Sequence, residues 1–158
     1  MATYVNDLRL TELVTGEGSG TWGTTTNTNL ELIGEALSYG TEAAFSSDAN
    51  ATTTVADGST DPARSLYYKV TSGASLTATR ELTIAPNTVS RVMIIENATS
   101  GSQIITIKQG SGATVNIPNG GVKLVYLDGA GSGAAVVEAT VDLDLTGTTT
   151  IAALTASG

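Results

Sequence analysis

The chain has 158 residues, close to the length of one ordinary domain, and it contains neither cysteine nor histidine. It therefore has no disulfide framework, and it lacks both the commonest metal ligand and the side chain best suited to acid–base catalysis near neutral pH. Its net charge of −8, without a basic cluster, argues against nucleic acid as a partner. Gly, Ser and Thr supply 59 residues, whereas Leu, Ile, Val and Phe supply 36. A chain so poor in bulky residues is expected to need neighbouring copies to complete its core.

Targeting signals are not apparent in the sequence. Residues 1–20 hold no continuous apolar run of the kind found in secretory signals. No stretch approaches the length of apolar sequence that a transmembrane helix requires. We therefore expect a soluble, unsecreted protein without membrane insertion.

Residues 1–25 have the composition of an extended, irregular N-terminal arm. A short run from Tyr4 to Leu10 is followed by a glycine-rich string that contains Trp22, the only tryptophan of the chain. Such a segment has little to pack against within itself, so we expect it to be mobile unless a surface holds it. Two interpretations of Trp22 are open: it fills the base of its own domain, or it fixes the arm to a partner subunit.

A short amphipathic helix is predicted over residues 26–40. Thr28 followed by Glu31 matches a capping box, and Gly40 is placed to end the helix. The apolar stripe of this helix consists of Leu30, Ile33 and Leu37, widened by Leu32 and Ala36. Because two to three turns are too few to be stable alone, the stripe is expected to dock on another surface.

The region 41–141 is a series of short β segments separated by turn-forming residues. The predicted strands cover residues 41–46, 51–56, 65–72, 80–85, 90–97, 103–109, 113–117, 121–128 and 134–141. Their spacing is typical of a sandwich or barrel. We predict an all-β fold (mainly β with one short N-terminal helix), an antiparallel, jelly-roll-like β-sandwich. Asn119-Gly120 is the clearest hairpin signal within it.

Two of these strands are apolar at consecutive positions, from Val92 to Ile95 and from Leu124 to Leu127. Successive side chains of a strand point to opposite faces of its sheet. Both faces of these strands should therefore be buried, one inside the sandwich and the other against something else.

The C-terminal residues 142–158 read as the start of a repetitive β shaft. Apolar and polar residues alternate strictly from Val137 to Leu145, and the chain then continues as TGTTTIAALTASG. The side chains expected to meet around a three-fold axis are Val141, Leu143, Leu145, Ile151 and Leu154. Such a tail cannot form a core alone, but three copies wound together can. A disordered C-terminus is the alternative interpretation.

The sequence offers no catalytic constellation. The glycine-rich strings 18–23 and 128–133 lack the βαβ unit or the following helix that a phosphate-binding loop needs, and we interpret the second as a hairpin loop. The serines have no histidine base. Asp142 and Asp144 share one strand face, an arrangement more typical of a solvated edge than of a cation site. We predict a non-enzymatic protein without cofactor or metal.

Two long runs of the sequence resemble a known family. They are GTWGTTTNTNLELIGEALSYGTEA and IENATSGSQIITIKQGSGATVNIPNGGVKLVYLDGAGSGAAVVEA. Over roughly residues 1–145 the chain resembles the N-terminal, virion-proximal region of tail-fibre proteins from marine bacteriophages, including short-tailed phages of cyanobacteria and related ocean bacteria. The resemblance implies a structural virion protein, a homotrimeric fibre whose N-terminal part attaches to the phage tail.

The resemblance also implies roles for particular segments. Tyr4, Leu8, Leu10 and Trp22 in the arm would attach the fibre to the tail adaptor, the nozzle or portal-proximal proteins. The helix and the strands would form the trimeric base, and host contact would pass through distal parts beyond Gly158. The protein would be located in the virion after assembly in the host cytoplasm.

Two further functions fit the same composition. A capsid decoration or head-fibre protein would share the symmetry and the small polar residues. A carbohydrate-binding β module belongs to a different class. Aromatic residues make up 4 % of the chain and include one Trp, which leaves little surface for stacking on sugars.

Overall fold

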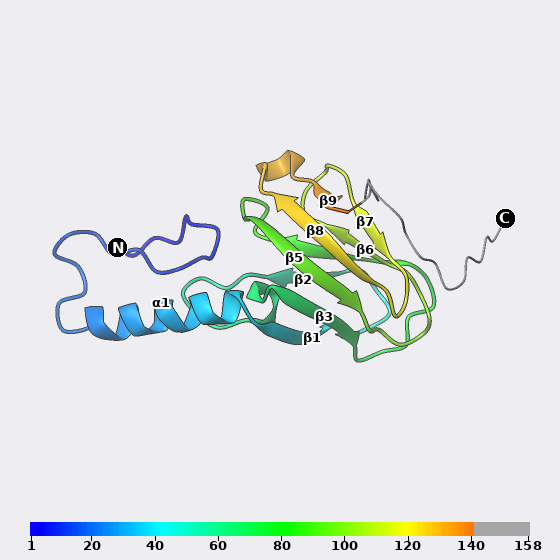
Figure 1. Ribbon diagram of the computed structural model, residues 1–158, viewed down its shortest axis with the longest axis horizontal. Helices are drawn as coiled ribbons and strands as arrows, with labels where there is room; N and C mark the ends of the chain where they lie inside the picture. Colours follow the sequence, from blue (N-terminus) through cyan, green and yellow to red (C-terminus); the bar gives the residue numbers. More distant parts are fainter. Residues whose placement is uncertain (141–158) are drawn as a thin grey trace, which may run out of the picture.

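The computed structural model describes residues 1–140. Helix α1 (Trp22–Ala36) projects from one end of a β-rich body, and the N-terminal arm, residues 1–21, lies alongside the helix (Figure 1). The β-rich body, called the β domain below, spans residues 39–138. The fold is mainly β with one helix, as the sequence predicted.

The β domain contains nine strands and two short 3-10 turns. They are β1 (Tyr39–Phe45), β2 (Ala51–Thr54), η1 (Pro62–Arg64), β3 (Tyr67–Ser72), β4 (Arg80–Ala85), β5 (Ser90–Asn97), β6 (Ile105–Lys108), β7 (Val115–Ile117), β8 (Val122–Asp128), η2 (Gly131–Gly133) and β9 (Val136–Glu138). Eight of the nine predicted strand segments contain one of these strands, and the ninth, 41–46, overlaps β1, which begins two residues earlier at Tyr39. The turn-forming residues in the sequence therefore located the strands correctly.

The strands form two mixed sheets, ordered β1-β3-β5-β8-β9 and β2-β4-β6-β7. From β1 to β6 the chain alternates between the two sheets, so neighbouring strands within each sheet run parallel. The pairs β5–β8, β6–β7 and β8–β9 are antiparallel. The prediction of antiparallel pairing is therefore wrong for four of the seven strand pairs.

Parallel pairing makes the chain coil through three stacked strand–loop–strand units, β1–β2, β3–β4 and β5–β6. Their loops stack at the end of the β domain remote from α1 (Figure 1). The amide of Gly73 donates to the carbonyl of Phe45, and that of Leu76 donates to the carbonyl of Ser100, each at 2.9 Å. Each unit thus rests on the one before it, as in a short solenoid.

One hydrophobic cluster lies between the sheets and draws on both. Its fully buried members include Phe45, Tyr68, Leu82, Ile84, Met93, Ile95, Ile105, Ile107, Ile117 and Leu127. Burying one large aliphatic side chain contributes about 1.5–3 kcal/mol. This cluster holds the inner faces of the two sheets together.

The Asn119-Gly120 turn does not close a hairpin, contrary to the prediction. It leads from β7 in one sheet to β8 in the other. The Asn119 side chain donates to the carbonyl of Thr99 at 2.6 Å, and the Gly120 amide donates to the carbonyl of Asn97 at 2.8 Å. The turn is therefore tied to the β5–β6 loop. The loop at 128–133, by contrast, does join the antiparallel pair β8–β9, as predicted.

Helix α1 begins four residues before its predicted start and ends four residues before its predicted end. The capping box does not form, because Thr28 and Glu31 both lie inside the helix. Instead, the amides of Thr21 and Trp22 each donate to the carbonyl of Gly18 at 2.8 Å, and this turn leads directly into the helix. The first turn is rich in Thr and Gly, which have low helix propensity, so the pattern placed the start too late.

Candidate assembly surface

The outer faces of the two sheets differ in chemistry. On the four-stranded sheet the outward residues are polar, including Thr52, Thr54, Glu81, Thr83, Lys108 and Asn116. On the five-stranded sheet they are mostly apolar. An antiparallel or mixed sheet with one solvated face normally carries polar residues there, as the four-stranded sheet does. The five-stranded sheet therefore has the pattern of a sheet that is covered on both sides.

We define the outer sheet face by six of its large apolar residues. These are Tyr39, Tyr67, Val92, Ile94, Leu124 and Tyr126. Strand register places four of them in one row, from Tyr39 through Tyr67 and Ile94 to Leu124. The ring centroids of Tyr39 and Tyr67 are 5.5 Å apart. Val92 and Tyr126 pair directly in the next row and are 51 % and 40 % exposed.

Two opposite charges at the centre of the outer sheet face are paired. Lys69 Nζ lies 3.0 Å from a carboxylate oxygen of Glu96, and the Tyr67 hydroxyl donates to Glu96 at 2.9 Å. These hydrogen bonds lower the pKa of Glu96, and the bond to Glu96 raises the pKa of Lys69. The two groups are therefore ionised together at neutral pH and place no net charge on this face.

Helix α1 has one buried side and one exposed apolar side. Leu32 and Ala36 are buried, whereas Leu30, Ile33 and Leu37 are 61 %, 38 % and 73 % exposed. The predicted stripe therefore does not pack against the chain's own β domain. Leu32 and Ala36, which were expected only to widen the stripe, pack there instead. We call Leu30, Ile33 and Leu37 the α1 seam.

Polar contacts decide which side of α1 faces the domain. The Asn29 side chain accepts from the amide of Thr11 at 3.0 Å and donates to its carbonyl at 2.9 Å, which ties the helix to the arm. In the last turn, Glu35 accepts from the Asp61 amide at 3.1 Å. Its carboxylate also lies 3.3 Å from Nε of Arg64. These bonds turn the Leu32 side inward and leave the seam outward.

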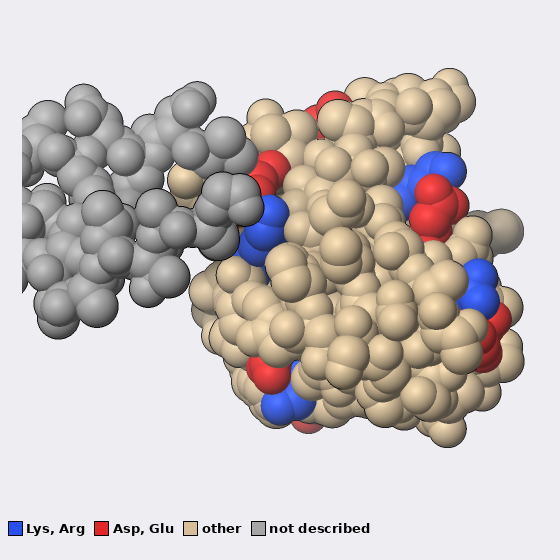
Figure 2. Space-filling model, turned by 90° about the vertical axis from the view of Figure 1, so that its right-hand side faces the viewer, with Lys and Arg blue, Asp and Glu red and all other residues tan. Residues whose placement is uncertain are grey.

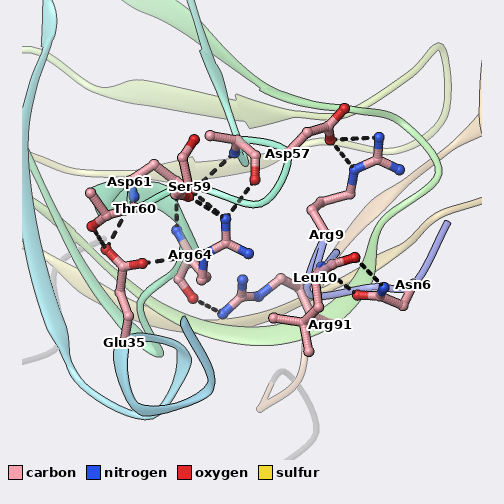
Figure 3. A network of polar contacts seen from close by, with 11 residues as sticks. Asn6, Arg9, Leu10, Glu35, Asp57, Ser59, Thr60, Asp61, Arg64 and Arg91 are labelled. Atoms are coloured by element: carbon pink, nitrogen blue, oxygen red, sulfur yellow. Dashed lines mark hydrogen bonds and ion pairs between the residues drawn. The ribbon is translucent and has the colours of Figure 1, made fainter. Parts of the chain in front are cut away.

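Arg64 is the centre of this polar network (Figure 3). Its side chain is completely buried. One terminal nitrogen donates to the carbonyl oxygens of Ala56 and Ser59, at 2.6 and 2.8 Å, and to the carboxylate of Asp61 at 3.0 Å. A buried charge is tolerated only when it is paired and hydrogen-bonded in this way. Arg64 therefore joins the 56–61 loop to α1.

Burial shifts the ionisation of two neighbours of Arg64. It raises the pKa of the Asp61 carboxyl, although the amide of Ala56 and the charge of Arg64 act in the opposite direction. Burial, followed by repulsion from Arg64, lowers the pKa of Arg91, which donates a hydrogen bond to the Arg64 carbonyl. The network is thus a desolvated structural junction.

The N-terminal arm folds back on the β domain. Arg9 is paired with Asp57 at 2.7 Å (Figure 3). The amide of Gly58 donates to the Arg9 carbonyl at 2.8 Å. The Ser90 amide donates to Asp7 at 2.8 Å. The sequence predicted an arm that stays mobile unless a surface holds it. The surface that holds it is the chain's own β domain.

The residues predicted for tail attachment lie in two kinds of environment. Tyr4, Leu8 and Leu10 are half-buried, whereas Trp22 is 66 % exposed at the start of α1. Sequence reasoning missed the other exposed apolar side chains of the arm, of which Val5 and Val14 are more exposed than Leu13 and follow only the N-terminal Met1. Strand-like alternation around Tyr4 would have indicated Val5. The predicted shaft contacts, namely Val141, Leu143, Leu145, Ile151 and Leu154, lie outside the described residues.

A groove of about 790 Å³ separates α1 from the 58–62 loop. Glu31, Glu35 and Asp61 line it together with hydroxyl side chains. Among residues 1–140, no cluster of three or more acidic side chains is arranged to hold a metal ion. This groove forms the open margin of the helix–domain junction.

The end of the β domain remote from α1 is almost uncharged. Figure 2 shows a broad surface of neutral residues, with basic and acidic side chains side by side around its periphery. Ion pairs of the β domain include Lys69–Glu96, Arg80–Asp48, Lys108–Glu81 and Lys123–Glu138. Basic and acidic groups thus offset each other locally, and no basic patch is seen on this face.

No family model, curated protein or solved structure matches this chain. Within residues 1–140, no helix is long and apolar enough to cross a membrane.

Proposed function

We propose that this chain is a structural virion protein, the virion-proximal part of a homotrimeric phage tail fibre. The observation that carries the proposal is the outer sheet face, an apolar surface that a single copy leaves uncovered. Large contiguous apolar patches on soluble proteins mark interaction sites. The deficit of bulky residues in the sequence points the same way, since further copies would complete the core.

In this proposal the two mixed sheets form a β-sandwich that serves as the trimeric base. The arm and α1, at one end, attach the fibre to the tail, and residues 142–158 begin the shaft. The Arg64 network supports a mechanical role, because it fixes α1 to the β domain through buried charges instead of a flexible linker. Force applied to the arm would pass through this junction into the sheets.

Attachment to the tail is assigned to the exposed apolar side chains of the arm. The partner would contact the exposed side chains Val5, Val14 and Trp22. The half-buried side chains Tyr4, Leu8 and Leu10 would instead hold the arm in its folded conformation. Partly exposed anchors of this type, Trp above all, dominate many protein interfaces. The partner would be the tail adaptor, the nozzle or a portal-proximal protein.

A carbohydrate-binding module is the second candidate. The observation in its favour is that Tyr39, Tyr67 and Tyr126 all lie on the outer sheet face. Tyrosine rings can stack on sugars, but the same rings are suited to a protein interface. A capsid decoration or head-fibre protein would use the outer sheet face as a tail fibre does and would differ in where it binds the particle.

The decisive experiment combines native mass measurement with capture by virion parts. At micromolar concentration the full chain should be a trimer that resists SDS without heating. A Val5→Asp, Val14→Asp double variant should remain trimeric but lose binding to purified tails of the phage that encodes it. A Thr3→Asp, Thr15→Asp variant, which alters exposed polar positions of the same arm, serves as the control. A monomeric chain, or capture by capsids instead of tails, would overturn the proposal.

A further inference from the structure

We propose that α1 is the helix that sets the symmetry of the assembly: three α1 seams pack in parallel around a three-fold axis as a short coiled coil. This inference rests on the proposed homotrimer and adds which surface determines its stoichiometry. In a closed ring of three identical subunits, the same face of each copy meets the axis, so the helices must run parallel.

The first support is the spacing of the exposed positions. A coiled coil needs core residues that alternate at intervals of three and four, the a and d positions of a heptad. On α1 and its C-cap these positions are Gly23, Thr26, Leu30, Ile33 and Leu37. The last three are the α1 seam, and all are exposed in the single chain. A heptad that faces solvent on an otherwise anchored helix indicates a missing partner helix.

The second support is the identity of the core residues. Leu30 and Leu37 fall at a positions and Ile33 at a d position. Leu at a with Ile at d disfavours two-stranded coiled coils and shifts the preference to three or four strands. The side chains of the seam thus agree with a three-fold assembly and argue against a simple dimer.

The third support is electrostatic. The chain carries a net charge of −8, so copies repel one another unless the contact surface is free of acid groups. The positions flanking the seam are Asn27, Asn29, Gly34 and Ala36, none of which is charged. Of the two acids on α1, Glu35 is engaged with Arg64. Glu31 lies on the side of the helix away from the seam. The seam can therefore approach its copies without like-charge contact.

The fourth support is preorganisation. Fifteen residues form a marginal helix in isolation, and two heptads give a weak coiled coil. Here Leu32 and Ala36 are buried and Asn29 is tied to Thr11, so the helix is already ordered before association. Association then costs less conformational entropy. The seam also ends at Leu37, two residues before Tyr39, the first residue of the outer sheet face. Both surfaces can therefore contact neighbouring copies around the same three-fold axis.

The first test measures oligomeric state by sedimentation velocity on the full chain. Wild type should be a trimer, and Ile33→Asp should shift it to monomer at the same micromolar concentration. Thr24→Asp places the same charge on the opposite, exposed side of α1 and should leave the trimer intact. Ile33 is 38 % exposed, so the far-ultraviolet circular dichroism of the variant should match wild type. A trimer that persists in folded Ile33→Asp would overturn the inference and leave the proposed function standing.

The second test uses the absence of cysteine from the sequence. Ile33→Cys introduces one thiol per chain, and a parallel bundle brings these thiols together at the axis. Mild oxidation should therefore cross-link two of the three chains, whereas Thr24→Cys should not cross-link. A wild-type dimer or tetramer, or cross-linking of Thr24→Cys equal to that of Ile33→Cys, would contradict a three-stranded seam. A monomeric wild type would instead refute the homotrimer on which the inference rests.

Discussion

Glu35 in the last turn of α1 lies 3.3 Å from the completely buried guanidinium of Arg64 in η1. Arg64 in turn lies 3.0 Å from Asp61 and donates to two backbone carbonyls of the preceding loop. Helix and β domain are thus joined through a charged group that water does not reach. Removing one partner of such a group leaves charge without compensation, which is costly.

Replacing Glu35 with alanine should destabilise the chain by about 2 kcal/mol, the scale of a hydrogen bond to a charged group. Arg64 would keep Asp61 but lose its link to α1, and the Asp61 amide would lose its acceptor. Glu35→Gln should cost less, because its carbonyl oxygen can still accept from that amide. Urea unfolding measures the change. Glu31→Ala, which truncates an exposed glutamate of the same helix, is the control, and an equal loss for both variants would contradict the network's role.

The pH dependence of stability should carry a signature of Asp61. Burial raises the pKa of this carboxyl above its ordinary value of 3.8, so the folded chain holds the proton more tightly than the unfolded chain. The stabilising contribution is complete below pH 3.8 and is lost as pH rises through the raised pKa. The free energy of unfolding of wild type relative to Asp61→Asn should therefore fall as pH increases from 4 to 7.

Asp57→Asn, a change to a half-exposed carboxylate of the same loop, is the control for this experiment. Its difference from wild type should vary less over the same range. A wild-type advantage over Asp61→Asn that increases with pH would show that the ion pair with Arg64 outweighs burial.

Much of the fold could be predicted from sequence because glycine-, proline- and asparagine-containing turns separate the strands. The pairing could not, since a turn looks alike whether the chain returns within a sheet or crosses to the other sheet. Asn119-Gly120 illustrates the difficulty: its dipeptide favours a hairpin, yet its bonds to Thr99 and Asn97 carry the chain between sheets. Long-range hydrogen bonds of this kind leave no local pattern.

The sequence also indicated part of the candidate assembly surface. Consecutive apolar residues in β5 and β8 predicted strands with both faces buried. The burial of Met93 and Val125 confirms this for the inner face. The side of α1 that packs on its own domain could not be read from hydrophobic periodicity, which ignores polar anchors. Asn29 and Glu35, which orient the helix through Thr11 and Arg64, carry no weight in such a pattern.

Two glycines should respond in opposite directions to the same substitution. Gly34 lies within α1, and a Cβ there would meet nothing within 4 Å. Gly34→Ala should therefore stabilise the chain by about 0.5–1 kcal/mol through higher helix propensity. At Gly40 a Cβ would lie 2.6 Å from the carbonyl oxygen of Pro62 and 2.5 Å from Ser65 Oγ.

Gly40→Ala should accordingly destabilise the chain by about 1–3 kcal/mol, the cost of overpacking, because β1 must move away from η1. Thermal unfolding at one protein concentration measures both variants. If the melting temperatures of both variants shifted equally in one direction, this account would be contradicted. The loss of glycine's conformational freedom in the unfolded chain would then outweigh the local contact at Gly40.

The outer sheet face can be tested apart from α1 by adding charge to its paired residues. Val92 and Tyr126 lie directly opposite each other on β5 and β8, and both are exposed, so a Val92→Lys, Tyr126→Lys variant should fold normally. It should associate at least tenfold more weakly, because two ammonium groups would have to be desolvated in the contact. Sedimentation equilibrium gives the dissociation constant. Thr52→Lys, on the polar outer face of the other sheet, should associate like wild type. If the double variant associates as tightly as wild type, the outer sheet face is a solvent-exposed surface and not the contact between copies.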